Sequence, residues 1–122
     1  MQLSLDNNGS VLIRAYQPGE LLIGEDQFHG PLIVTPDAVH GDWSPTAIAE
    51  LSIADFEPVL AHQPEVVLFG TGPTQQFPPL ALISAVMSRG VGFEVMDTAA
   101  ASRTFNVLAG EGRRVVAALL ID

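Results

Sequence analysis

The second half of the chain alternates between short, mostly apolar runs and stretches with a helical repeat. The runs cover residues 66–69, 92–96 and 115–121 and are rich in valine and leucine. Runs with little polar alternation are typical of strands that other layers cover on both faces. Helical stretches separate the runs. The order strand, helix, strand, helix, strand therefore predicts an α/β sheet whose buried strands lie side by side.

Turn residues divide the first half into shorter pieces. Strand-forming residues gather in four stretches, at 11–16, 21–23, 32–35 and 39–40. Residues 25–27 are polar and are predicted to form a loop, and Pro18 and Gly19 stand where a type II turn places proline and glycine. We expect this half to form a small antiparallel β meander attached to one side of the α/β sheet.

The first predicted helix begins at Ser52. Asp55, three residues later, is a capping-box partner, and apolar side chains recur at helical spacing up to residue 60. Pro58 removes a backbone hydrogen bond, so this helix is expected to be short and to end near residues 62–64.

Two further helices lie between the apolar runs. Two prolines open a helix over residues 80–87, and Gly90 ends it. Because this helix is apolar nearly all round, we expect it to be deeply packed. Asp97 or Thr98 caps another helix that runs to residue 109.

Composition indicates one acidic domain over residues 1–122. The chain is 48% apolar, which is enough to build a core without a metal or a disulfide. Its net charge is -9, and nine acids against one arginine in residues 1–63 supply most of it. Such a chain repels phosphate backbones, so nucleic acid is not an expected partner. Cysteine and lysine are both absent, which excludes thiolate and Schiff-base chemistry, and no cofactor is indicated.

The sequence shows no targeting or membrane-spanning segment. Residues 1–6 lack the basic region and the long apolar run of a signal peptide. The longest apolar run, residues 115–121, is far too short to cross a bilayer. We therefore expect no membrane insertion and a cytoplasmic location.

A glycine-rich turn follows the first buried run. Gly70, Thr71 and Gly72 lie at the carboxyl end of a predicted strand, where open α/β sheets bind ligands. The turn is not a dinucleotide fingerprint, because Gln75 stands where glycine is needed, and it has no lysine for a Walker loop. Two interpretations stay open: amides that hold a small anion, or a tight turn that only glycine can make.

Polar residues also gather around the next strand and helix. Glu94 and Asp97 bracket a strand end, and Arg103 and Asn106 lie on the following helix. In a ligand pocket they would supply acceptors, a bidentate donor and an amide, with Glu94 as a candidate base. In a scaffold, Glu94 or Glu111 would pair with Arg103. Asp97 and Asn106 would then form hydrogen bonds with backbone groups. We favour the scaffold, because ion-pair networks gather charges in the same way.

No catalytic or metal-binding motif is present. His29, His40 and His62 lack metal-ligand spacing, and none of the seven serines lies in a nucleophile elbow. We assign no catalytic residue and no metal ligand.

Four stretches, in this order and spacing, resemble one known family. They are VLFGTG at 67–72, GFEVMDT at 92–98, RTFNVL at 103–108 and EGRRV at 111–115. The chain resembles a family of small bacterial domains of unknown function. Relatives of that family include a mitochondrial factor for assembly of respiratory complex I and an adipogenesis-associated domain protein.

The resemblance carries expectations about fold and role. It implies a compact layered fold with a mixed central sheet, flanking helices and an extra β layer, in which the last strand can run antiparallel to its neighbours. It brings no established catalytic activity. The best-described role in the family is assembly of respiratory-complex subunits through protein contacts.

Two functional hypotheses follow. The first is a non-enzymatic protein-interaction or assembly-type domain with an unidentified protein partner. The resemblance, the acidic first half and the absence of a catalytic set favour it. The second is a binder of a small anionic ligand, or an enzyme, that uses the turn at 70–72 with Glu94, Asp97, Arg103 and Asn106. It predicts a hollow beside the turn, lined by those side chains.

Overall fold

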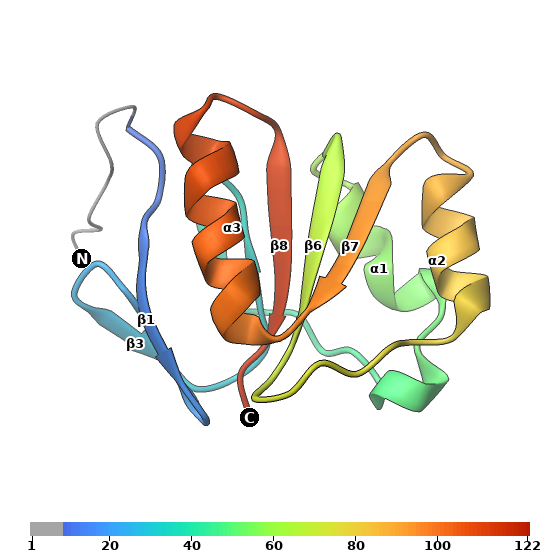
Figure 1. Cartoon of the computed structure of the whole chain (residues 1–122), viewed down its shortest axis with the longest axis horizontal. Helices are drawn as coiled ribbons and strands as arrows, with labels where there is room; N and C mark the ends of the chain where they lie inside the picture. Colours follow the sequence, from blue (N-terminus) through green and yellow to red (C-terminus); the bar gives the residue numbers. More distant parts are fainter. Residues whose placement is uncertain (1–8) are drawn as a thin grey trace.

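A five-stranded sheet forms the middle layer of the part of the chain that the computed structural model describes, residues 9–122 (Figure 1). Helix α3 and a small three-stranded sheet cover one face, and helices α1 and α2 cover the other. The helices are α1 (Ile53–Leu60), α2 (Leu80–Met87), α3 (Thr98–Gly110) and the 3-10 helix η1 (Ile48–Glu50). The prediction about a signal peptide concerns residues 1–6, which lie outside the described residues.

The small sheet is the predicted antiparallel meander. Its strands are β1 (Ile13–Gln17), β2 (Glu20–Ile23) and β3 (Asp26–Phe28), paired in that order. Gly19 has a φ of 88°, as the predicted turn requires. The predicted loop at 25–27 is wrong, because residues 26 and 27 belong to β3. Gly24, with a φ of 62°, allows a two-residue turn that brings this polar stretch back against β2.

The central sheet has the order β5-β4-β8-β6-β7. Its strands are β4 (Leu32–Val34), β5 (Val39–His40), β6 (Val66–Thr71), β7 (Gly92–Met96) and β8 (Val115–Leu120). Strand β6 runs parallel to β7 and β8, whereas β4 runs antiparallel to β8. The mixed sheet and the side-by-side order of the three apolar runs are therefore confirmed, but the run at 92–96 is not buried as predicted, since β7 is an edge strand in which only Phe93 is buried.

Two details of the strand arrangement differ from expectation. The last strand, β8, is antiparallel to β4 but parallel to β6, as a right-handed crossover through α3 favours. Strands β4 and β5 pair within the central sheet instead of extending the meander. All three residues of β4 are buried. A strand with two apolar faces is buried most fully in the middle layer, and β4 lies there, paired with β8.

Alternate residues of each central strand face different hydrophobic cores. Val66 and Leu68 pack with Phe105 of α3 and with the small sheet. Val67 and Phe69 pack on the other face, in the cluster that contains residues of α1 and α2. This is why β6 has no polar alternation, since neither of its faces meets solvent.

Helix α1 has the predicted capping box, which also holds the loop before it. The Asp55 carboxylate accepts a hydrogen bond from the Ser52 amide at 2.9 Å, and it accepts two more from the amide and hydroxyl of Thr46, both at 3.1 Å. The Trp43 indole donates to the Asp55 carbonyl at 2.8 Å. One aspartate therefore ties the loop at 43–50 to α1.

Helix α2 is far more exposed than its apolar sequence predicts. Leu82 and Val86 are buried, but Leu80 is 78% exposed and Met87 is 55% exposed. The prediction of deep packing is wrong for the outer side of the helix. Helix α2 packs beside β7, the edge strand of the sheet, and the described part of the chain places no further layer beyond it (Figure 1).

Candidate functional site

Packing at the carboxyl end of β6 accounts for both glycines of the predicted turn. A Cβ atom on Gly70 would lie 2.8 Å from Cδ2 of Leu119 and 3.1 Å from Cα of Thr98. Gly72 has a φ of 91°, a conformation that side chains rarely adopt. The space beside Gly70 is filled by protein, so the turn itself leaves no room for a ligand.

Two buried hydroxyl groups hold this end of the sheet together. The Thr98 hydroxyl donates to the Leu120 carbonyl at 2.5 Å and accepts from the Gly72 amide at 2.8 Å. The Thr71 hydroxyl donates to the Thr74 carbonyl at 2.6 Å and accepts from the Gln76 amide at 3.1 Å. Backbone groups therefore use both hydroxyls, and they fix the loop that follows β6.

A hollow of about 770 Å³ opens just beyond this turn, at the carboxyl ends of β6 and β8. Thr71 and Pro73 form the wall on the side of the turn, Pro45 and Ile48 form the opposite wall, and Asp122 adds a carboxylate. In Figure 1 the C-terminus lies at the lower edge of the view and marks this end of the sheet. A hollow of this volume has the size of sites that take drug-sized ligands or side chains of a partner.

The loops at this end of the sheet are acidic. Within residues 9–122 these loops contain no arginine, and their acids are Asp42, Asp97 and Asp122. Three more acids lie at this end on neighbouring elements: Glu20 of β2, Glu50 of η1 and Asp55 of α1. Burial alone would raise the pKa of Asp55, but backbone and hydroxyl hydrogen bonds outweigh it and keep the pKa below its ordinary value. Burial, and then the charges of Asp122 and Asp97, raise the pKa of Tyr16. The hollow therefore lies in a negative field.

The polar residues predicted to line the hollow lie elsewhere. Asp97 caps α3 and accepts from the Ala100 amide at 2.8 Å. The Asn106 amide group makes two hydrogen bonds with the backbone of Ile13, at 2.9 and 2.8 Å, and so joins α3 to β1. Both side chains bind backbone groups, as the scaffold interpretation predicts.

Glu94 and Arg103, two of the three charged members of the predicted cluster, do not pair. Glu94 is exposed on β7, and Arg103 is exposed on α3 beside a separate hollow of about 210 Å³ that Asn106 also lines. Within residues 9–122 the ion pairs are Glu57–Arg89 and Glu65–Arg113, so the predicted partnership of Arg103 with Glu94 or Glu111 is not formed. A ligand-binding role for these residues stays a prediction.

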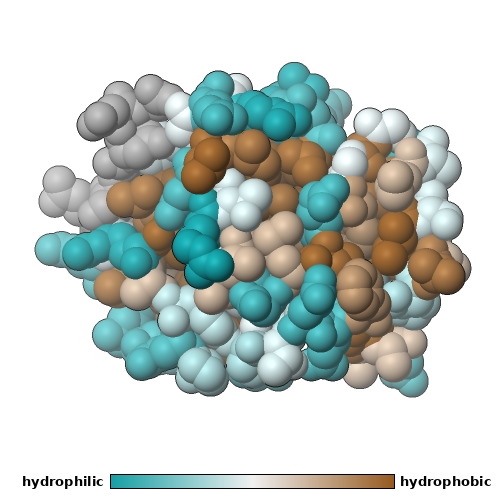
Figure 2. Space-filling model, in the orientation of Figure 1, coloured by the Kyte–Doolittle hydropathy of each residue, from teal (hydrophilic) through white to brown (hydrophobic). Residues whose placement is uncertain are grey.

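An exposed apolar surface lies over α2, and the sequence did not indicate it. Phe77, just before the helix, is 67% exposed and joins Leu80 and Met87; we call these three residues the α2 surface. Figure 2 shows apolar side chains gathered at the right-hand side of the molecule, where Figure 1 places α2. A helix that is apolar on all sides predicts burial, and no sequence signal shows that the strand beside it, β7, is at the edge of the sheet.

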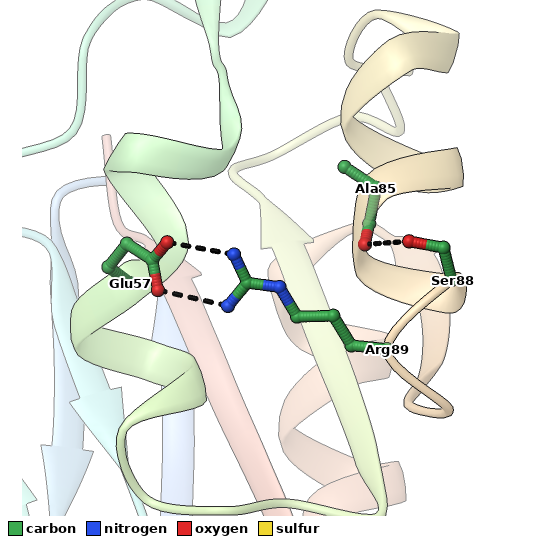
Figure 3. A network of polar contacts seen from close by, with 4 residues as sticks. All are labelled: Glu57, Ala85, Ser88 and Arg89. Atoms are coloured by element: carbon green, nitrogen blue, oxygen red, sulfur yellow. Dashed lines mark hydrogen bonds and ion pairs between the residues drawn. The ribbon is translucent and has the colours of Figure 1, made fainter.

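An ion pair connects Arg89, just after the C-terminal end of α2, to α1. The Arg89 guanidinium donates two hydrogen bonds to the Glu57 carboxylate, at 3.0 and 2.9 Å (Figure 3). The hydrogen bond from Arg89 lowers the pKa of Glu57. Both side chains are about half exposed, so the pair adds little stability, although its two-pronged geometry links the end of α2 to α1.

Comparison with known proteins gives one family and several relatives. Residues 13–120 match the family described as "Protein of unknown function (DUF498/DUF598)". The NADH dehydrogenase [ubiquinone] 1 alpha subcomplex assembly factor 3 of Danio rerio is 30% identical over 115 residues, covering 93% of this chain and 66% of that protein. This chain thus spans about two thirds of the assembly factor's length.

Two bacterial relatives match over most of both chains. A protein of Francisella tularensis named 13 kDa major membrane protein is 29% identical over 107 residues, 86% of each chain. In this chain, no helix within the described residues is long and apolar enough to span a bilayer. A solved structure from Xanthomonas campestris is 37% identical, covers 99% of this chain and 92% of that one, and superposes with a TM-score of 0.84.

Proposed function

Because the chain belongs to the DUF498/DUF598 family of proteins of unknown function, we propose that it acts as a non-enzymatic assembly factor that binds other proteins. In this proposal the chain works as a single domain in the cytoplasm. Its client is a subunit of an NADH dehydrogenase, as the name of the Danio rerio relative suggests for that protein. The acidic surface keeps the factor soluble and favours a basic partner.

The α2 surface is the observation that carries this proposal. Leu80 and Met87 on α2, and Phe77 just before it, expose large apolar side chains beside the edge of the sheet. Exposed apolar groups that gather in one place mark contact surfaces, whereas scattered ones need no explanation. Aromatic and methionine side chains are also enriched at the centres of protein interfaces. The surface therefore suits a partner that covers α2 with apolar side chains of its own.

The test is genetic and uses variants on the surface. In a strain that lacks this protein, we expect the double variant Leu80→Asp, Met87→Asp to restore about one tenth or less of the assembled NADH dehydrogenase that the wild type restores. A carboxylate in the middle of a desolvated contact costs roughly 2 kcal/mol or more of binding, which exceeds a tenfold change. Native gels stained for NADH dehydrogenase activity measure the assembled enzyme.

The matched control is Val107→Asp. Val107 is 59% exposed, much like Met87, but it lies on α3, on the other side of the central sheet. This variant should restore assembly fully. Full restoration by the double variant, or normal assembly in the strain without the protein, contradicts the proposed function.

A further inference from the structure

The hollow at the carboxyl end of the sheet combines apolar walls with one carboxylate, that of Asp122. Pro31, Pro45, Ile48 and Leu120 supply apolar surface, and Asp122 supplies a carboxylate within the lining. Arginine and lysine side chains bury an apolar stem while their charged head stays near water or an acid. The lining therefore offers apolar surface for the stem of a basic side chain and a carboxylate for its charged head.

The charge around the hollow strengthens this match. The loops at this end carry acids and no arginine, while Arg89, Arg113 and Arg114 lie in loops at the opposite end of the strands. Asp55, on the helix behind the loop at 45–50, accepts four hydrogen bonds from Thr46 and Ser52 as an ionised carboxylate. The carboxylate of Asp122 in the lining and the acids around the hollow give it a negative field, and such a field concentrates ligands of the opposite sign.

The hollow also lies next to the start of the α2 surface. Pro73 and Gln76 line the hollow, and Phe77, the next residue along the chain, is the first member of the α2 surface. The Thr71 hydroxyl fixes this connecting loop from below, through the Thr74 carbonyl and the Gln76 amide. A partner that covers α2 can therefore extend a segment into the hollow without rearranging the loop.

We propose that the hollow receives an arginine-containing extended segment of the same partner protein that covers the α2 surface. This inference rests on the proposed function and adds the chemistry of the partner: an apolar patch with a basic segment beside it. The guanidinium head lies near Asp122, and the stem lies along the proline and isoleucine walls. Arginine suits this place because its planar head can donate two parallel hydrogen bonds to a carboxylate and is weakly hydrated.

Fluorescence anisotropy tests the inference with the whole protein. The probe is a short fluorescein-labelled peptide of alternating leucine and arginine residues, and its control has citrulline, which is neutral and of the same shape, in place of arginine. We expect the citrulline peptide to bind about tenfold more weakly or worse, and the arginine peptide to lose affinity as salt is raised. Equal binding of the two peptides overturns the inference.

Two pairs of variants locate the binding. Ala49→Trp fills the hollow and should weaken binding of the arginine peptide about tenfold, whereas Ala54→Trp, on the exposed side of α1 and outside the hollow, should not change it. Asp122→Asn should weaken binding about three- to fivefold, as an exposed ion pair allows, whereas Glu111→Gln at the opposite end should have no effect. Unchanged binding in Ala49→Trp also overturns the inference.

Two further outcomes separate this inference from its alternatives. If free agmatine, which carries the guanidinium without a peptide, binds as tightly as the peptide, the hollow is a small-molecule site and the inference is wrong. If Ala49→Trp and Asp122→Asn restore NADH dehydrogenase assembly while Leu80→Asp, Met87→Asp does not, the inference fails and the proposed function stands. If all of these variants restore assembly, both fail.

Discussion

Replacing Phe56 by alanine is expected to lower the free energy of unfolding by about 3–5 kcal/mol. Phe56 is fully buried on α1, and its ring makes edge-on contacts with Trp43, Phe69 and Phe93 at centroid distances of 5.3 to 5.5 Å. The substitution removes apolar surface and leaves a cavity that three rigid rings cannot close. Edge-on aromatic pairs add a further contribution beyond the buried area.

Urea unfolding followed by far-UV circular dichroism measures this loss. Phe77→Ala is the matched control, because it removes the same ring from a side chain that is 67% exposed, and it should change stability by less than about 0.5 kcal/mol. A loss below about 2 kcal/mol for Phe56→Ala would mean that the core between α1 and the sheet is not packed as described. The pair of variants thus tells core aromatics from those of the α2 surface.

Replacing Gly70 by alanine is expected to cost about 2–3 kcal/mol of stability. The added Cβ atom would meet the Leu119 side chain at 2.8 Å and the Thr98 hydroxyl and Cα atom at 3.0 and 3.1 Å. Leu119 is fully buried and cannot swing away, and the Thr98 hydroxyl is tied to the Leu120 carbonyl and the Gly72 amide. Relief therefore requires β6 and α3 to move apart.

Gly30→Ala is the control for this prediction. A Cβ atom on Gly30 has no neighbour within 4 Å, so its stability should change by less than about 1 kcal/mol. Thermal unfolding compares the two variants. Equal melting temperatures would show that the carboxyl end of β6 is looser than described, and would reopen the space beside Gly70 for a ligand.

The buried strands could be predicted because their sequences are short apolar runs without polar alternation. Residues 66–69 and 115–121 are apolar on both faces, and only a strand between two layers satisfies that pattern. Caps were equally informative. Asp97 and Ser52 stand directly before helical periodicity, and both proved to be N-caps.

The exposure of α2 could not be predicted from its sequence. An all-apolar helix signals burial when other layers surround it, but the sequence pattern does not say how many strands lie on each side. Because β7 is the edge strand, the outer side of α2 has no covering layer among residues 9–122. The same uncertainty about strand order explains why β4 and β5 were expected in the meander.

The predicted polar cluster separated for a geometric reason. Asp97 and Asn106 follow the end of β7 along the chain, but α3 crosses to the opposite face of the sheet from α1 and α2. Asn106 therefore faces β1, while Glu94 lies on β7 at the edge. Nearness along the chain predicted one pocket, whereas the handed crossover placed these side chains on different surfaces.

Photocrosslinking in cells tests most directly whether α2 is where a partner binds. The account predicts that p-benzoylphenylalanine in place of Leu80 forms a covalent adduct with a different protein on irradiation, and that the same residue in place of Val107 forms none. Leu80 and Val107 are both exposed, so the photoreactive side chain is accessible at either position. The absence of an adduct from position 80, with or without one from position 107, would contradict the account.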